Sequence, residues 1–239
     1  MEPKKIPTFI DGLDELLGGG LPPAHVVLVS GLPGTMKSTL TYAILHGNAL
    51  RRHAKCLYVS LEQTRPSLER QMASMSFDVE AVRGDLHIVD VGTIQKEIGK
   101  GSSKPWMEFL RRTLTTTKDI DGVDLLAIDS LEALEVLAKF KDRRREMYRL
   151  FEWLRDLGVT SFLVTERPDW LIAGHVLQGR WDEDFLADGV IHLRMHFVTD
   201  LTAQRRLRVV KMRGTKHETG YLAMDVDDGR FRVTRAMSS

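Results

Sequence analysis

Short apolar segments alternate along the chain with longer stretches of mixed polarity. The apolar segments are rich in Val, Ile and Leu and do not alternate with polar residues, which is typical of strands covered on both faces. Between two of them, Arg143–Leu157 places its apolar residues on one helical stripe and ends before Gly158. This alternation predicts a parallel sheet with helical crossovers, and therefore an α/β fold. The predicted parallel strands are His25–Ser30, Lys55–Leu61, Leu86–Val91, Asp124–Asp129, Thr160–Thr165 and Gly189–Leu193.

The pattern changes after residue 200, where the apolar segments become shorter and tight turns separate them. Gly214 and the pair Asp228-Gly229 mark two of these turns. This part of the chain predicts an antiparallel extension of the same sheet. Its predicted strands are Arg206–Met212, Tyr221–Val226 and Phe231–Val233. We see no repeat, linker or low-complexity segment, so we expect a single domain over residues 1–239.

Composition narrows the classes of function. Lys and Arg number 34 against 33 Asp and Glu, and the net charge of +1 gives no support for a nucleic-acid partner, although it leaves a local basic patch open. We interpret the basic run Lys139–Arg145 as a solvated helix face. We expect a cytoplasmic protein without a membrane span, because no apolar run approaches roughly 18 residues and no signal-peptide core is present. The lone Cys56 excludes an internal disulfide, and the histidines show no metal-ligand spacing.

A glycine-rich segment, G-L-P-G-T-M-K-S-T, follows the first predicted strand and leads into the helical stretch Ser38–His53. It matches the phosphate-binding pattern G-x-x-x-x-G-K-[ST], except that Met36 stands where glycine is expected. In this pattern the loop N–H groups and the helix dipole bind phosphate, the lysine (Lys37) reaches the β- and γ-phosphates, and the hydroxyl (Ser38) ligates Mg²⁺. We therefore predict a binding site for ATP or GTP. Its candidate residues are Gly31, Leu32, Pro33, Gly34, Thr35, Met36, Lys37, Ser38 and Thr39.

Met36 is the unusual feature of this loop. If its position needs a positive φ, a side chain there costs roughly 1–2 kcal/mol. Bound nucleotide can offset a strain of that size, and backbone strain tends to persist at functional sites. The alternative, a chance turn between a strand and a helix, fits the Lys-Ser-Thr ending poorly. We interpret the site as altered but working, and we expect slow turnover.

Two strand ends supply candidate carboxylates. Asp124–Asp129 is an apolar strand that we expect beside the loop, with Asp129 holding Mg²⁺ or its water. Strands ending in Asp are common, so this assignment depends on the loop. The strand Lys55–Leu61 is followed by Glu62, which could orient and deprotonate the attacking water. The alternative, a solvated strand-end glutamate, is equally compatible with the residues.

Three separated segments resemble one family, the KaiC-like ATPases of the RecA superfamily. They are the lead-in Ile6–Pro22, the strand end Leu61-Glu62-Gln63, and Lys211-Met-Arg-Gly-Thr-Lys-His217. The resemblance covers residues 6 to 235. It implies a RecA-like P-loop NTPase core, in which a mostly parallel sheet is flanked by helices and carries a C-terminal antiparallel extension. It also implies homo-oligomeric rings, typically hexamers, with ATP bound between subunits.

The resemblance assigns roles to individual residues. Glu62 would be the general base, and Lys211, Arg213 and His217 would reach the nucleotide of an adjacent subunit. Cations supplied in trans stabilise charge on a transferring phosphoryl group, as an arginine finger does. The other reading of Lys211 and Arg213 is a solvated strand edge. The family often carries two adjacent glutamates at its catalytic position, whereas this chain has Gln63 as the second residue.

Three functions stay open at this point. The leading one is a ring-forming ATPase that signals its nucleotide state to an unknown protein partner. The second is a non-hydrolysing ATP-binding switch or scaffold, like the ATP-binding subunit of the archaellum motor, which Met36 and Gln63 favour. The third is a DNA-binding recombinase paralogue, motivated by the irregular segment 166–180, where Trp170, and Trp181 just after it, could stack bases. Thr165, just before that segment, is a candidate sensor of the γ-phosphate.

Overall fold

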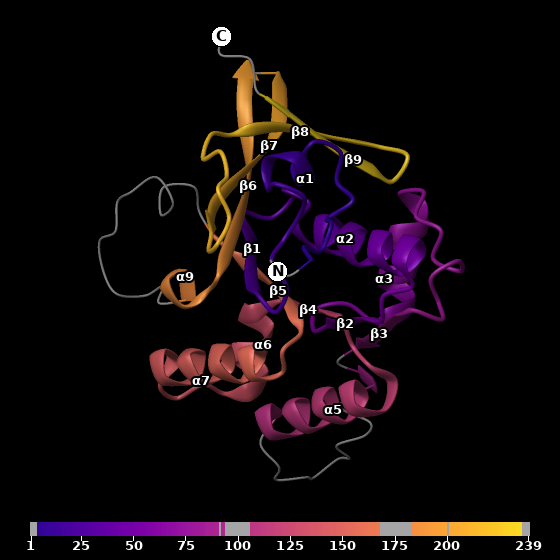
Figure 1. The fold of residues 1–239 in the computed structure, drawn as a ribbon, viewed down its shortest axis with the longest axis vertical. Coiled ribbons are helices and arrows are strands. Elements are labelled where there is room, and N and C mark those ends of the chain that lie inside the picture. Colours follow the sequence, from indigo (N-terminus) through magenta and orange to yellow (C-terminus); the bar gives the residue numbers. More distant parts are fainter. Residues whose placement is uncertain (1–3, 91, 94–105, 168–182, 200, 236–239) are drawn as a thin grey trace.

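The computed structural model describes residues 4–90, 92–93, 106–167, 183–199 and 201–235. One sheet of nine strands runs through these residues in the order β3-β2-β4-β5-β1-β6-β7-β8-β9 (Figure 1). The strands from β3 to β6 pair in parallel, and β7, β8 and β9 continue the sheet antiparallel. The predicted fold class is therefore confirmed. The strands are β1 Val26–Gly31, β2 Cys56–Ser60, β3 Leu86–Asp90, β4 Leu125–Asp129, β5 Thr160–Glu166, β6 Gly189–Thr199, β7 Thr202–Met212, β8 Leu222–Asp227 and β9 Arg230–Arg235.

Helices cover both faces of the parallel part of the sheet (Figure 1). Successive residues of a strand point to opposite faces, so β1 sends Val27 and Val29 into one core and Val26 and Leu28 into the other. The first core includes residues of α2 and α3, and the second includes residues of α5, α6 and α7. The described helices are α1 Leu13–Leu16, α2 Lys37–Arg52, α3 Arg65–Ser74, α5 Trp106–Asp121, α6 Leu131–Ala138, α7 Arg143–Asp156 and α9 Glu183–Leu186.

Both strands of the β6–β7 hairpin extend further toward their connecting turn than predicted. Its backbone ladder continues to the pair Thr199 and Thr202. Beyond Leu193 the side chains leave the core, and near the tip Phe197 is 73% exposed. The prediction relied on buried apolar runs, whereas strand pairing needs only backbone hydrogen bonds.

We expect the strand ending at Asp129 to lie beside the loop, and in the structure Asp129 is hydrogen-bonded to Ser38, which directly follows Lys37. The two strands are nevertheless not neighbours in the sheet, because β5 lies between β1 and β4. The carboxyl ends of these strands still meet at one edge of the sheet, because they run in parallel. The register places Gly31 opposite Glu166 on β5, and Asp129 opposite Ser60 on β2. The fold thus brings the loop and the carboxylates to the same edge.

Candidate functional site

The glycine-rich loop connects β1 to α2 in a conformation that requires glycine at one position and favours it at another. Gly31 has φ +150°, and a Cβ there would lie 2.2 Å from the carbonyl oxygen of Leu193. Gly34 has φ +81°. Met36 also lies in the left-handed region, with φ 72° and ψ 31°, directly before α2. The positive φ considered for Met36 is therefore what the structure contains, and its side chain packs partly buried against the first core.

The N-terminus of α2 is open to an anion. No side chain caps it, and no acidic residue stands in its first turn. The first N–H groups of a helix have no partner within the helix, and the helix dipole gives this end a positive potential. Thr35 is buried and satisfies its own hydroxyl on the carbonyl of Leu32 at 2.7 Å. The geometry of residues 31–39 is thus that of a phosphate-binding loop.

Lys37 occupies the first position of α2. Its Nζ donates to the carbonyl of Leu32 at 3.1 Å. Burial lowers the pKa of Lys37, and nearby carboxylates oppose that shift. Sequence reasoning anticipated two of them and missed the others, which lie at the end of β5 and in the first turn of α6. The four carboxylates are Glu166, Asp129, Glu132 and Glu62.

Asp129 is buried and joined to two hydroxyl groups. Tyr58 donates to its Oδ2 at 2.6 Å. Burial raises the pKa of Asp129, while hydrogen bonds from Tyr58 and Ser38 and the charge of Lys37 act in the opposite direction. The pKa of Tyr58 is raised well above its ordinary value, chiefly by burial, so its hydroxyl stays a donor. Sequence reasoning missed Tyr58, because its nearness to Asp129 depends on the pairing of β2 with β4.

Glu62 lies just beyond β2 and is exposed. The hydroxyl of Ser130, which follows β4, donates to its Oε1. The backbone N–H of Leu61 donates to the carbonyl of Asp129 at 2.7 Å, which joins the ends of β2 and β4. Gln63 instead donates its amide to Gln71 on α3 at 3.1 Å. Glu62 is therefore held near Lys37, and its neighbour Gln63 is occupied elsewhere.

Further contacts surround the loop. The hydroxyl of Thr165 donates to Glu132 at 2.5 Å, and the N–H of Glu166 donates to the same oxygen at 2.9 Å. Arg205 on β7 donates to the carbonyl of Gly34 at 3.5 Å. Sequence reasoning missed Glu132 and Arg205, since only the folded sheet and helices bring them here. Thr39, the last candidate residue of the loop, lies two residues after Lys37 and is buried.

Lys211 and Arg213 lie toward the N-terminal end of β1, whereas the glycine-rich loop follows its C-terminal end. Arg213 donates its N–H to Asp188, whose own N–H donates to Val26 at the start of β1. About 16 Å of strand separates that level from Gly31. Within one chain these cations therefore do not meet the loop. His217 lies beyond them in the same segment, with its Nδ1 3.0 Å from the carbonyl of Thr215.

Two other predictions concern basic or aromatic residues. Trp170 and Trp181 lie outside the described residues. The basic run Lys139–Arg145 is only partly a solvated face, because Arg143 pairs with Glu135 at 2.9 Å and with Glu183 at 2.8 Å.

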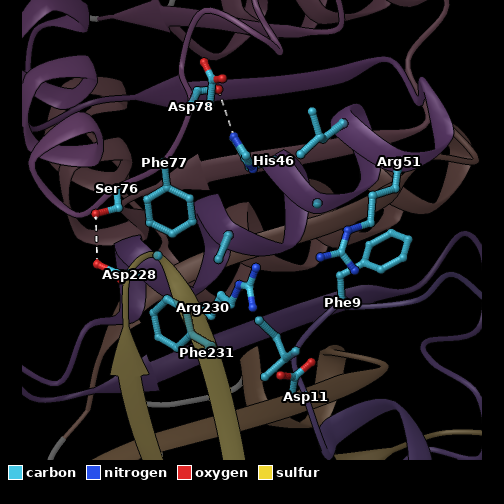
Figure 2. Close-up of a pocket in the computed structure, with 15 residues that line it drawn as sticks. Phe9, Asp11, His46, Arg51, Ser76, Phe77, Asp78, Asp228, Arg230 and Phe231 are labelled. Carbon is cyan, nitrogen blue, oxygen red and sulfur yellow. Dashed lines mark hydrogen bonds between the residues drawn. The ribbon is translucent and has the colours of Figure 1, made fainter.

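A separate cavity of about 460 Å³ lies along the later turns of α2 (Figure 2). Its walls come from the lead-in at residues 9–11, from α2 residues 43–51, from residues 76–78 and from the turn between β8 and β9. The guanidinium of Arg51 lies 4.8 Å from the centre of the Phe9 ring, and His46 Nε2 lies 3.0 Å from the carbonyl of Asp78. None of the lining residues belongs to the loop or to the carboxylates around Lys37.

The described part of the chain contains neither a cluster of metal ligands nor a membrane-spanning helix. It contains no group of three or more His, Cys, Asp or Glu side chains placed to hold a metal ion. None of its helices has the length and apolar character that crossing a membrane requires.

The fold and this site define the class of protein. A phosphate-binding loop follows β1, and one strand lies between β1 and the strand ending in Asp129. Antiparallel strands extend the sheet beyond β6. This is a P-loop nucleotide-binding protein of the RecA type.

Comparison with known proteins identifies the family. The family model described as "ATPase: KaiC" matches residues 6–238, and the chain belongs to this family. The circadian clock oscillator protein KaiC of Prochlorococcus marinus subsp. pastoris is 31% identical over 256 residues, covering 100% of this chain and 48% of the relative. KaiC of Rippkaea orientalis is 31% identical, covering 99% and 46%.

A solved structure supports the same assignment. The KaiC-like protein of the archaeon Pyrococcus horikoshii OT3 superposes with a TM-score of 0.79 at 25% identity, covering 96% of this chain and 98% of that one. The chain thus spans about half the length of the curated relatives it matches, and nearly the whole of this archaeal protein.

Proposed function

We propose that this chain is a slow ATPase that works in a homo-oligomeric ring, typically a hexamer, and presents its nucleotide state to a protein partner. We also propose that residues 1–239 act as one cytoplasmic domain. The observation that carries the proposal is the convergence of Lys37, Asp129 and Glu62 at one sheet edge, beside the uncapped N-terminus of α2. A phosphoryl-transfer site needs an anion cradle, a metal-binding carboxylate and a base in this arrangement.

The loop residues fit a triphosphate. Their N–H groups and the first turn of α2 would bind phosphate oxygens, and Lys37 would exchange the carbonyl of Leu32 for the β- and γ-phosphates. The described residues fit Mg²⁺ as well. Ser38 and Asp129 are oxygen ligands already in contact. Burial raises the pKa of Asp129 and so disfavours its charged form, and a bound cation would offset that cost and favour the carboxylate. Bound Mg²⁺ would supply neutralisation of the phosphate charge.

Glu62 is the proposed general base. It is exposed to the water that must attack, and Ser130 holds one of its oxygens while leaving the other free to accept the proton. Thr165, whose hydroxyl donates to Glu132, would respond to the γ-phosphate. Lys211 and Arg213 are proposed to act on the nucleotide of an adjacent subunit, which their distance from the loop of their own chain supports.

The test compares Glu62→Gln with the wild type for phosphate release and for ATP-dependent assembly, the latter by light scattering. We expect hydrolysis to fall about 100-fold or more, because a general base contributes at least that factor. Assembly with ATP and Mg²⁺ should persist. Glu152→Gln, at an exposed position of α7, makes the same charge change away from the site and should behave as wild type.

An unchanged rate in Glu62→Gln would contradict the assigned base. ATP-dependent assembly without hydrolysis in the wild type would instead favour the non-hydrolysing switch. Two observations motivate that second function: Met36 has a left-handed conformation, and Gln63 is bonded to Gln71.

A further inference from the structure

The short helix α9, Glu183–Leu186, holds the two cations that the proposed function offers to a neighbour. Lys211 Nζ donates to the carbonyls of Asp184, Phe185 and Ala187 at 3.0, 3.2 and 2.6 Å. Arg213 donates to the carbonyl of Phe185 at 2.9 Å and to the Asp188 carboxylate at 2.7 Å. The place of both cations is therefore set by the backbone at the C-terminal end of α9.

The other end of α9 is fixed by a buried ion network. Glu183 is fully buried and accepts from Arg167 at 2.5 Å and from Arg143 at 2.8 and 3.0 Å. Arg167, also fully buried, donates in addition to Asp184 at 3.0 Å. A helix of four residues has too few internal hydrogen bonds to be fixed by itself. The carboxylate of Glu183, clamped by two guanidinium groups, supplies that constraint.

The ion network also contacts the phosphate-binding loop of its own chain. The N–H of Arg167 donates to the carbonyl of Gly31 at 3.1 Å, directly after β5. Through Arg167, Glu183 and α9, one continuous set of contacts runs from Gly31 to Lys211.

The polarity of α9 is the reverse of what packing alone would favour. It buries the charged Glu183 and leaves Phe185 68% exposed. A buried ion pair adds little net stability compared with well-packed apolar residues, and its best use is to specify one geometry. An exposed aromatic beside Lys211 and Arg213 is typical of a surface that meets another subunit.

We propose that Glu183 is a positioning residue for ATP hydrolysis: through α9 it sets the place of Lys211 and Arg213, which serve the nucleotide of an adjacent subunit. This inference rests on the proposed function, in which the ring completes each site. Glu183 touches no nucleotide and acts only through α9.

The first measurement is the steady-state kinetics of Glu183→Gln. Removing the charge loosens α9, so we expect kcat to fall about 100-fold, the loss that a displacement near 1 Å can cause. The KM for ATP should change by less than about twofold, because Glu183 does not contact Lys37, and Arg167 bonds to Gly31 through its backbone N–H and not through the guanidinium that Glu183 holds. Asp184→Asn weakens one contact at a partly exposed position and should lower kcat in the same direction by a smaller factor. Glu152→Gln is the control and should match wild type.

The decisive measurement mixes two variants, each with low activity alone. Glu62→Gln subunits lack the base but carry an intact α9, so they can supply Lys211 and Arg213 to a Glu183→Gln neighbour. In randomly mixed closed rings at equal amounts, about a quarter of the sites combine an intact base with an intact donor. The mixture should therefore hydrolyse ATP at about a quarter of the wild-type rate per subunit. A misfolded Glu183→Gln subunit could not be rescued in this way.

A parallel mixture of Lys211→Ala with Glu62→Gln separates the two levels of the proposal. Rescue of both mixtures supports it. Rescue of Lys211→Ala without rescue of Glu183→Gln, or wild-type kcat in Glu183→Gln alone, overturns the role of Glu183 and leaves the proposed function standing. Failure to rescue Lys211→Ala removes the action in trans, and the inference falls with it.

Discussion

Replacing Met36 by glycine tests whether the phosphate-binding loop is strained. Met36 has φ 72° and ψ 31°, where an L-residue costs roughly 1–2 kcal/mol. Glycine adopts this conformation freely and is the residue that the loop pattern expects. Met36→Ala is the matched control, because alanine keeps the left-handed strain and loses the same side-chain packing.

The magnitudes follow from the surroundings of Met36. Its side chain is partly buried against the first core, so removing it costs about 1 kcal/mol, near half the value for a fully buried methionine. Met36→Ala should therefore lower the free energy of unfolding by about 1 kcal/mol. Met36→Gly pays a further 0.5–1 kcal/mol, roughly, in backbone entropy but recovers about 1–2 kcal/mol of strain. Its stability should lie between about 1 kcal/mol below and about 0.5 kcal/mol above that of wild type.

Urea unfolding of the nucleotide-free protein measures the stabilities, and phosphate release measures turnover. We expect Met36→Gly to hydrolyse ATP faster than wild type, by about 30-fold at most, since a strain of about 2 kcal/mol corresponds to that factor. A glycine variant less stable than the alanine variant by the whole backbone-entropy cost, roughly 0.5–1 kcal/mol, would show that Met36 is unstrained. A glycine variant no faster than wild type would refute the link between Met36 and slow turnover.

Two further predictions concern groups whose pKa is shifted. The Tyr58 hydroxyl lowers the pKa of Asp129 against the larger raising effect of burial, so Tyr58→Phe should raise that pKa further. Asp129 must be ionised to bind Mg²⁺, and the acid limb of the pH–rate profile should therefore move to higher pH; an unmoved limb would contradict this assignment. Burial raises the pKa of Cys56 to about 12. At pH 8 a thiol reagent should label native protein about 1,000-fold more slowly than protein in urea, and similar rates would show that Cys56 is accessible.

The sequence predicts those parts of the fold that leave a local pattern of apolar residues. Strands buried on both faces appear as apolar runs, so the centres of β1, β2, β4 and β5 could be read directly. The outer half of the β6–β7 hairpin could not, because its side chains are exposed and its strands depend on backbone pairing alone. The order of the strands is also absent from the local pattern. Nothing near Asp129 indicates that β5 would lie between its strand and β1.

The candidate site likewise contains residues that a local motif predicts and residues that only non-local packing brings to it. Residues 31–39 form a contiguous motif whose chemistry depends on local backbone, and the positive φ of Met36 was open to prediction from the glycine it replaces. Tyr58, Glu132 and Arg205 belong to no motif. Each reaches the loop or its carboxylates through non-local packing: Tyr58 by the pairing of β2 with β4, Glu132 through α6, and Arg205 through β7.

Lys211 and Arg213 present a third case, in which the motif is visible but its meaning depends on another chain. Arg213 lies level with the start of β1 and Gly31 with its end, so neither rotamer changes nor a short loop shift would bring the guanidinium to its own chain's phosphates. A role at a nucleotide is therefore open to these cations only between subunits. The proposed role of α9 follows from the same geometry. In the proposed ring these cations would reach across an interface, where the nucleotide of their own chain cannot order them. The contacts that hold them are the carbonyls of Phe185 and Ala187, with the buried Glu183 behind them.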